Sequence, residues 1–309
     1  LASRFNIVAD PNERGAHKES TPTGAGIVFA LVWLIAVFLT GNFSPELFAL
    51  IAIGALGWLD DFNPLPWQGR LVVQLLCVSW VIYSLELPSE ISLPLAIESH
   101  WIWPFVLGFA LLWFLNLYNF MDGIDGIAAT EACFALLVVC AFGWHSGGNI
   151  VLPATLLACC AGFLMINWPS AKVFMGDIGS GFLGLAIGAM AITEIGLPLV
   201  TWFILLGWFI ADATTTLLVR FHMGDRVYEA HSKHAYQHLN RALGTQNTLL
   251  ILLIVNVVWL LPLAVLSVFY HEVSTILLLL ALLPLAALHY WWGAGQEQPI
   301  WDRLKANDN

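Results

Sequence analysis

The fold of this chain is decided by stretches such as residues 101–126, WIWPFVLGFALLWFLNLYNFMDGIDG, in which a long apolar run ends in amides and carboxylates. Of the 309 residues, 59% are hydrophobic and only 10% are charged, and the mean hydropathy is +0.80. Soluble domains carry about 25% charged residues. The composition therefore indicates an integral membrane protein.

The apolar runs predict the membrane spans. A spanning helix needs about 20 mostly apolar residues, with about 17 tolerated. We predict an all-α polytopic helix bundle with ten transmembrane helices. Because no linker or low-complexity tract divides the chain, we expect a single transmembrane domain over residues 1–309. The expected spans are residues 24–40, 44–59, 71–87, 101–118, 127–144, 150–166, 179–194, 197–219, 248–270 and 273–292.

The basic residues predict the orientation. With ten spans, all eleven Lys and Arg residues fall on one face, and an excess of these residues marks the cytoplasmic side. The polar segments, which are residues 10–23, 60–61, 116–125, 167–177 and 220–241, emerge on that same face. A transporter would more often carry its coupling carboxylates near the bilayer midplane. Carboxylates at helix ends could instead meet a water-soluble substrate and a lipid.

Carboxylate and amide side chains at these ends are candidate ligands. Asp60 and Asp61 close a predicted span, and one interpretation is simply an acidic helix end before a proline. The other is a pair that binds metal or a proton. The second is favoured because two carboxylates at a helix C-terminus oppose the helix dipole, and no cation adjoins them in the sequence. Asn116, Asn119, Asp122 and Asp125 follow at steps of three, which keeps them near one helical face. The alternative is a polar cap followed by a turn. Their oxygens are hard ligands, suited to Mg²⁺.

Three further features carry alternatives. Asp177 precedes a glycine-rich helix start, where it could serve merely as an N-cap. A helix would place three histidines, His231, His234 and His238, on one face. The segment from His231 to His238, called the histidine segment below, could bind phosphate, could ligate zinc or could be a solvated polar helix with no ligand. The acidic residues Glu131 and Asp212 lie within spans and should face the bundle interior. The sequence names no partner for Asp212.

Taken together, these motifs resemble the polyprenyl-phosphate N-acetylhexosamine-1-phosphate transferases of the glycosyltransferase 4 type. The resemblance covers nearly the whole chain. It rests on five motifs in order, which are residues 10–14 with His17 and Thr21-Pro22-Thr23, Asp60-Asp61, residues 116–128, residues 174–184 and residues 231–238.

The resemblance implies a reaction at the cytoplasmic face of the bacterial inner membrane. Undecaprenyl phosphate and a UDP-N-acetylhexosamine would give undecaprenyl-diphospho-sugar and UMP, with Mg²⁺ as cofactor and Mn²⁺ as a substitute. By this analogy Asp177 and Asn119 are metal ligands, and Asp60, Asp61 and Asp177 are catalytic. Substrate-binding residues would be Lys18, Thr23, Asn116, Asn119, Asp122, Asp125, His231, His234 and His238. The expected partners are these two substrates and membrane lipid, and no nucleic acid partner is expected. Whether the protein forms a homodimer is left open.

Departures from the family pattern refine this expectation. In the phospho-MurNAc-pentapeptide transferase of peptidoglycan synthesis, a Lys is expected a few residues after the acidic pair, and three histidines are adjacent. This chain has no Lys soon after Asp60-Asp61, and its histidines are spaced apart. Both differences favour the enzymes that start O-antigen synthesis. Family members usually have another helix before residue 10, so an eleventh N-terminal helix is expected to be missing. An ion- or proton-coupled transporter and a structural membrane scaffold remain the alternatives from other classes. The sequence does not specify the N-acetyl sugar.

Overall fold

The protein is described by a computed structural model that covers residues 8–9, 21–85, 101–229 and 231–302. Lys18, which was predicted to bind substrate, lies outside these ranges. The chain folds into two compact units, one ending at Leu199 and the other beginning at Val200. The described residues of each unit are helical, apart from a two-residue antiparallel ladder in which Val8 pairs with Pro22. The single-domain interpretation stays a prediction.

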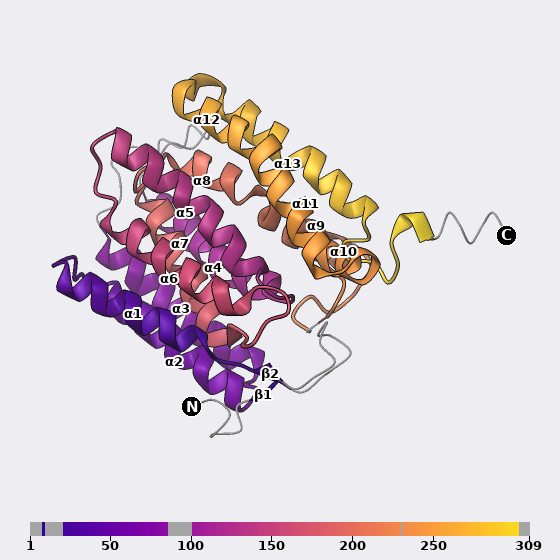
Figure 1. The fold of residues 1–309 in the computed structure, drawn as a ribbon, viewed down its shortest axis with the longest axis horizontal. Helices are drawn as coiled ribbons and strands as arrows, with labels where there is room; N and C mark the ends of the chain where they lie inside the picture. Colours follow the sequence, from indigo (N-terminus) through magenta and orange to yellow (C-terminus); the bar gives the residue numbers. More distant parts are fainter. Residues whose placement is uncertain (1–7, 10–20, 86–100, 230, 303–309) are drawn as a thin grey trace. The chain divides into compact units, whose positions relative to one another are not determined.

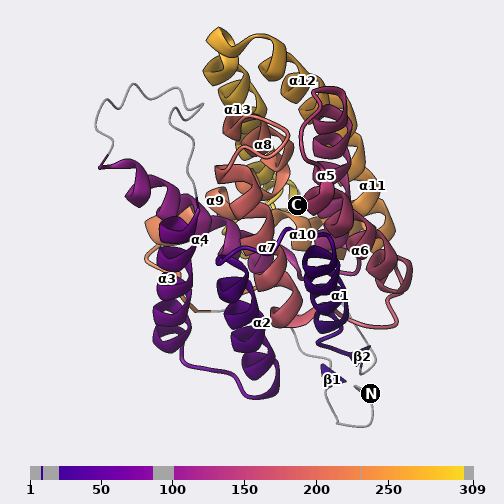
Figure 2. The same ribbon diagram turned by 90° about the vertical axis from the view of Figure 1, so that its left-hand side faces the viewer.

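The first unit contains the helices that carry the acidic motifs (Figure 1). Its elements are β1 (Val8–Ala9), β2 (Thr21–Pro22), α1 (Gly26–Leu39), α2 (Leu47–Phe62), α3 (Trp67–Ser84), α4 (Trp103–Met121), α5 (Ile127–His145), α6 (Val151–Asn167) and α7 (Gly176–Ile192). Figure 2 shows α1, α2 and α3 side by side, and α2 contacts both of its neighbours. Helix α2 ends just before Asn63, because a residue that precedes a proline disfavours helical backbone.

Helix α7 forms the centre of this unit. It packs against α1, α2, α4 and α5, and nearly every residue from Ile178 to Ile192 is buried. Glycines allow the close approach: a Cβ at Gly184 would lie 2.6 Å from the carbonyl oxygen of Phe114 in α4, and one at Gly57 would overlap the backbone of Asp177. The start of α7 is therefore held directly against the end of α2.

The second unit contains α8 (Leu199–Leu205), α9 (Gly207–His222), α10 (Ala235–Leu243), α11 (Thr245–Val255), the π-helix η2 (Asn256–Leu260), α12 (Leu261–Phe269), the 3₁₀ turn η3 (His271–Val273) and α13 (Ser274–Trp291). The predicted span 197–219 is bent by 76° between α8 and α9. The predicted span 248–270 contains η2 immediately before Pro262, whose missing N–H interrupts regular helical bonding.

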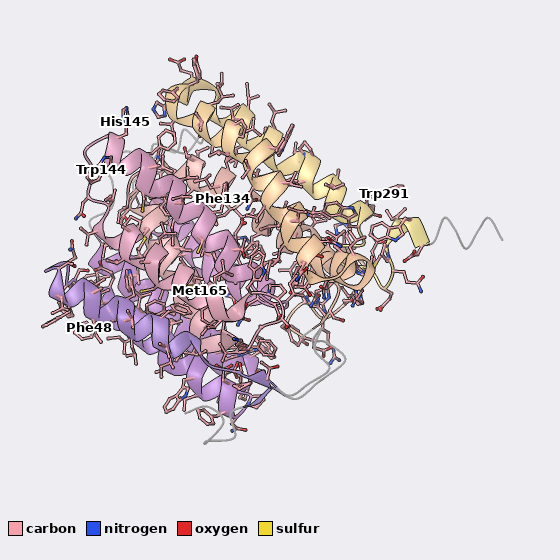
Figure 3. The ribbon with its side chains drawn as sticks, viewed as in Figure 1. Phe48, Phe134, Trp144, His145, Met165 and Trp291 are labelled. Atoms are coloured by element: carbon pink, nitrogen blue, oxygen red, sulfur yellow. The ribbon has the colours of Figure 1, made fainter. Side chains whose placement is uncertain are left out.

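The membrane character is plain from the helices. Within the described residues, four helices are long and apolar enough to cross a membrane, and the bent pair α8–α9 makes a fifth. Three further apolar helices, α1, α6 and α7, are shorter. Large apolar side chains such as Trp144 and Met165 stay exposed on the surface, at 77% and 83% (Figure 3), as expected for contact with lipid. The all-α membrane fold is confirmed, and the count of ten spans stays a prediction.

Candidate active site

Asp61 caps the N-terminus of α7. Its Oδ1 accepts a hydrogen bond from the backbone amide of Asp177 at 2.9 Å, and its Oδ2 accepts one from the amide of Ile178 at 3.3 Å. The first amides of a helix have no partner within the helix, and the helix dipole favours a negative charge beside them. The interpretation of Asp177 as an N-cap is wrong, because Asp177 lies in the first turn of α7 and Asp61 performs the capping.

The cap requires a glycine at position 176. Gly176 has φ +74°, which strains other residues, and a Cβ there would lie 2.5 Å from Oδ2 of Asp61. The preceding chain is fixed as well, because the amide of Phe174 donates to the carbonyl of Pro22 at 2.8 Å and the amide of Ala25 donates to the carbonyl of Phe174 at 3.0 Å. Thr23, a predicted substrate-binding residue, is thereby brought beside the start of α7.

Asp60 is held by Arg70, a basic residue that none of the sequence motifs indicated. Its Oδ1 accepts a hydrogen bond from the amide of Leu65 at 2.6 Å, and its Oδ2 accepts one from Nη1 of Arg70 at 2.7 Å. The same Nη1 lies 3.8 Å from Oδ2 of Asp177. The expectation that the acidic pair has no neighbouring cation is wrong. The short turn after Phe62 returns the chain, so that the first turn of α3 brings Arg70 to the end of α2.

Asn119 connects α4 to the carboxylate cluster, which is formed by Asp60, Asp61 and Asp177 with Arg70 beside them. Its Nδ2 donates to Oδ1 of Asp177 at 2.8 Å and lies 3.2 Å from Oγ of Ser180. Asn116 does not join the cluster, because its Nδ2 donates to the side chain of Gln74 at 3.2 Å and to the carbonyl of Leu112 at 2.9 Å. The structure therefore brings one of these two amides, Asn119, to Asp177.

The predicted helical face over residues 116–125 is only partly correct. Helix α4 ends at Met121, so Asp122 is its C-cap and Asp125 lies in the loop before α5. Asp125 is buried, and its Oδ2 accepts a hydrogen bond from the amide of Ala171 at 2.9 Å. The next residue, Gly126, adopts φ +75°, which ends any continuous helix. Asp125 therefore anchors one loop of the site to another.

Three carboxyl groups of the site have raised pKa values, because they are buried and because negative charge is concentrated around them. Burial, the hydrogen bond with Asp60 and the charge of Asp61 raise the pKa of Asp177 to about 7. Burial, together with the charge of Asp60, raises the pKa of Asp61 to about 6 despite its two backbone hydrogen bonds. Burial and the charges of Asp177, Asp61 and Asp125 raise the pKa of Asp122 well above its usual value.

Asp60 differs from its neighbours. Burial opposes its ionisation, but hydrogen bonds with Asp177 and with the amide of Leu65, and the charge of Arg70, outweigh burial and lower its pKa. The site therefore contains one carboxylate stabilised by Arg70 and several carboxyl groups that disfavour ionisation. A divalent cation would relieve this crowding of negative charge.

The residues present fit Mg²⁺ in a limited way. Among the described residues, no group of three or more His, Cys, Asp or Glu side chains is arranged to hold a metal. Mg²⁺ needs fewer protein ligands, since it commonly uses one or two carboxylates together with water and substrate phosphates. Asp177 and Asn119, whose side chains are in direct contact, can supply such a partial set.

The histidine segment belongs to the second unit. Helix α10 begins at Ala235 with His234 as its N-cap, so the prediction that all three histidines share one helical face is wrong for His231. The rings of His231 and His234 stack instead, with centroids 4.8 Å apart. His238 has partners of its own: Nε2 lies 3.1 Å from the carbonyl of Gln296 and Nδ1 lies 3.0 Å from Nη2 of Arg241.

Burial and ring geometry bear on the alternatives for the segment, and its role in binding phosphate stays a prediction. His234 and His238 are 2% and 3% exposed, so a solvated polar helix is excluded. In the described part of the chain, no three histidines are arranged to hold a metal ion, and the rings of His231 and His234 stack on each other instead. Glu131 and Asp212 are fully buried, as predicted. The partner that the sequence could not name for Asp212 is the start of α10, whose first two amides donate to its carboxylate.

The fold and the site define a multi-pass helical membrane protein with an acidic site where helices end. A sequence profile of glycosyl transferase family 4 matches residues 43–195. The chain is 30% identical over 227 residues to the phospho-N-acetylmuramoyl-pentapeptide-transferase of Heliobacterium modesticaldum. This alignment covers 65% of the chain and 68% of that protein.

Two other relatives carry the names of N-acetylglucosamine enzymes. The probable undecaprenyl-phosphate N-acetylglucosaminyl 1-phosphate transferase of Bacillus subtilis is 28% identical over 272 residues, covering 82% of this chain and 75% of that protein. The decaprenyl-phosphate N-acetylglucosaminephosphotransferase of Mycolicibacterium smegmatis is 30% identical over 224 residues, covering 63% and 55%. The chain spans 60% of the length of two other similar transferases.

The chain belongs to glycosyl transferase family 4 and, within it, to the polyprenyl-phosphate N-acetylhexosamine-1-phosphate transferases. The predicted family and the predicted enzyme class, a sugar-phosphate transferase, are confirmed.

Proposed function

We propose that this protein transfers an N-acetylhexosamine-1-phosphate from a UDP-sugar to undecaprenyl phosphate at the cytoplasmic face of the bacterial inner membrane. An oxygen of the lipid phosphate attacks the phosphorus next to the sugar, the bond to the other phosphate breaks, and UMP leaves. The observation that carries this proposal is the contact of Asp177 with Asp61 and Asn119, which collects oxygen ligands from α2, α4 and α7 at one place.

Phosphoryl transfer depends mainly on positioning and on neutralising oxygen charge. Mg²⁺ held by Asp177 and Asn119 would supply that neutralisation; Mn²⁺ is expected to substitute for it. Asp61 positions Asp177 through the backbone of α7, and Asp60 holds Arg70 beside the same carboxylate. Thr23 and Lys18 are proposed to help bind phosphate, Asp122 and Asp125 to shape the nucleotide pocket, and the histidine segment to bind the sugar pyrophosphate.

Asp60 and Asp61 act as positioning groups rather than as a general base in this proposal. The second pKa of a phosphate monoester is near 6, so the lipid phosphate is largely dianionic at pH 7. Each oxygen of both carboxylates also has a hydrogen-bond donor, from Leu65 and Arg70 for Asp60 and from the first amides of α7 for Asp61. Accepting a proton would disturb these contacts.

The identity of the sugar separates two candidate pathways. The spaced histidines favour an enzyme that starts O-antigen or a related envelope glycan, whereas a relative named phospho-N-acetylmuramoyl-pentapeptide-transferase favours peptidoglycan synthesis comparably. Both use the same bond-forming step, so the carboxylate cluster does not discriminate between them. A transporter is disfavoured because Asp61 and Asp177 lie at helix ends.

The deciding experiment is incubation of purified protein with undecaprenyl phosphate, Mg²⁺ and a panel of donors that includes UDP-N-acetylhexosamines and UDP-MurNAc-pentapeptide. We expect UMP release with one N-acetylhexosamine donor and loss of release in EDTA. Release from UDP-MurNAc-pentapeptide alone would assign the protein to peptidoglycan synthesis. The absence of release from every donor would contradict transferase activity of this chain and return attention to the scaffold and transporter alternatives.

A further inference from the structure

A buried carboxylate organises the histidine segment. Asp212 of α9 is 0% exposed, and its oxygens face four donors. Oδ1 accepts a hydrogen bond from the amide of Ala235 at 3.0 Å and from Oγ1 of Thr216 at 3.1 Å, and it lies 3.2 Å from Nδ1 of His234. Oδ2 accepts a hydrogen bond from the amide of Tyr236 at 2.9 Å.

These contacts determine where α10 begins. Ala235 and Tyr236 are the first residues of the helix, whose amides need an external acceptor. A second bond supports the same start, because the backbone amide of His234 donates to Oε1 of Gln237 at 3.1 Å. Asp212 lies 23 residues before Ala235. The start of α10 is therefore fixed by a capping residue of α9 and not by local sequence alone.

The same carboxylate orients a ring. An imidazole that faces a carboxylate through Nδ1 carries its proton there, which makes Nε2 the acceptor nitrogen. The His234 ring stacks on His231 with an interplanar angle of 25°. Nδ1 of His231 in turn accepts a hydrogen bond from the amide of Lys233 at 3.3 Å. A constraint on His234 is therefore passed to the ring of His231.

His238 is held by a different part of the second unit. Its contact with the carbonyl of Gln296 is joined by a hydrogen bond from the amide of Gly295 to the carbonyl of Lys233 at 2.7 Å. Lys233 also forms an ion pair with Glu297 at 2.6 Å. The turn after α13 thus holds one side of the histidine segment, while Asp212 holds the other.

We propose that Asp212 is a positioning residue for the donor site, because it fixes the start of α10, the His234 ring and, through ring stacking, the His231 ring. This inference rests on the assignment of the histidine segment to the UDP-sugar donor made above. Asp212 does not touch the substrate in this proposal; it sets the orientation of the two rings that do.

The test compares Asp212→Asn with Thr216→Val. Asparagine keeps the shape of the side chain but presents an NH₂ group to the amide of Tyr236, whereas valine at position 216 removes only a donor to the same carboxylate. We expect Asp212→Asn to raise the KM for the UDP-sugar by about 10-fold to 100-fold, since small displacements of binding groups have effects of this size. The KM for undecaprenyl phosphate should stay unchanged, and Thr216→Val should resemble the wild type.

A change in the KM for the UDP-sugar alone distinguishes a positioning role of Asp212 from loss of folded protein. Loss of folded enzyme would lower the apparent kcat and leave both KM values unchanged, and that result would overturn the inference. Equal KM values in Asp212→Asn and Thr216→Val would also overturn it. A wild-type protein that releases no UMP from any donor would instead contradict the proposed function on which the inference rests.

Two measurements do not depend on turnover. Nitrogen-15 NMR of the wild type should show His234 protonated at Nδ1, with the resonance assigned by its loss in His234→Gln; a neutral ring protonated at Nε2 would overturn the inference even if Asp212→Asn fails to fold. Hydrogen exchange at Ala235 and Tyr236 should be faster in Asp212→Asn than in Thr216→Val. Unchanged exchange in both variants would show that Asp212 does not hold the start of α10.

Discussion

The carboxylate of Asp61 accepts a hydrogen bond at 2.9 Å from the backbone amide of Asp177, which lies 116 residues further along the chain. Two acidic residues are thereby joined through backbone rather than by a shared ligand. The contact leaves the Asp177 side chain to Asn119 and to the neighbourhood of Arg70. Asp61 therefore acts on the site by fixing where α7 begins.

The first prediction concerns this cap. Gly176→Ala should reduce UMP release by about 100-fold, because its Cβ displaces the Asp61 carboxylate and moves Asp177. Gly147→Ala is the matched control: Gly147 also has a positive φ of 72°, but a Cβ there meets nothing within 4 Å. Backbone strain should cost each variant about 1 kcal/mol of stability, and Gly176→Ala should lose more than Gly147→Ala because its Cβ overlaps the Asp61 carboxylate. Similar activities in the two variants would contradict a role for the cap.

The second prediction divides the work among the carboxylates. Asp177→Asn should lower turnover at every pH, because it removes a proposed metal ligand. Asp60→Asn and Asp61→Asn should show a nearly constant loss between pH 6 and pH 8, because the lipid phosphate already ionises near pH 6. UMP release measured across this range tests the prediction. Recovery of Asp60→Asn or Asp61→Asn as the pH rises would contradict the positioning role and assign a general-base role to that residue.

The third prediction concerns Arg70. Its charge lowers the pKa of Asp60, so their pairing stabilises the fold above the ordinary aspartate pKa of about 3.9 and is lost as the pH falls through the lowered value. Arg70→Gln should reduce the free energy of unfolding at pH 7 by about 0.5–1 kcal/mol, a modest value because the Arg70 side chain is 35% exposed. The difference from wild type should shrink at pH 3, which thermal unfolding can measure.

The fourth prediction links Mg²⁺ to pH. Burial and nearby negative charge raise the pKa of Asp177 to about 7, so the metal-free folded state holds a proton that the unfolded state releases near pH 4. Without metal, this group lowers the free energy of unfolding as the pH rises from about 4 to 7. Mg²⁺ binding should therefore raise the Tm more at pH 7.5 than at pH 5.5.

Unfolding scans with Mg²⁺ and with EDTA at both pH values measure this difference. Asp177→Asn is the control, and it should show a small Mg²⁺ effect that does not change with pH. An equal rise in Tm at pH 5.5 and 7.5 in the wild type would contradict the proposed coupling between the metal and Asp177.

The fifth prediction is topological. In a variant without the native cysteines, Ser146→Cys should react with an impermeant thiol reagent added to sealed cells, whereas Lys172→Cys should react only after lysis. The expectation follows from the one-sided distribution of Lys and Arg, and both positions are exposed in the structure. Labelling of Lys172→Cys in sealed cells would reverse the predicted orientation.

The sequence by itself determined the membrane setting, the family and the approximate positions of the apolar helices. Long apolar runs and the residues that end them act locally, so α2 ends before Asn63-Pro64 and Pro104 lies in the first turn of α4. The motifs predicted that Asp60, Asp61, Asn119 and Asp177 belong to one site, and the structure brings these residues together at the start of α7. Their position at helix ends followed from the chain alone.

Only the tertiary structure decided the partners of these groups. Asp61 pairs with backbone amides at the start of α7, Asp212 pairs with those at the start of α10, and Arg70 pairs with the side chain of Asp60, so each contact joins two different helices. Core and lipid-facing residues in a membrane bundle are similarly apolar, so an apolar face does not reveal which helix will cover it. Buried polar groups must still find partners, and packing decides which partners are within reach.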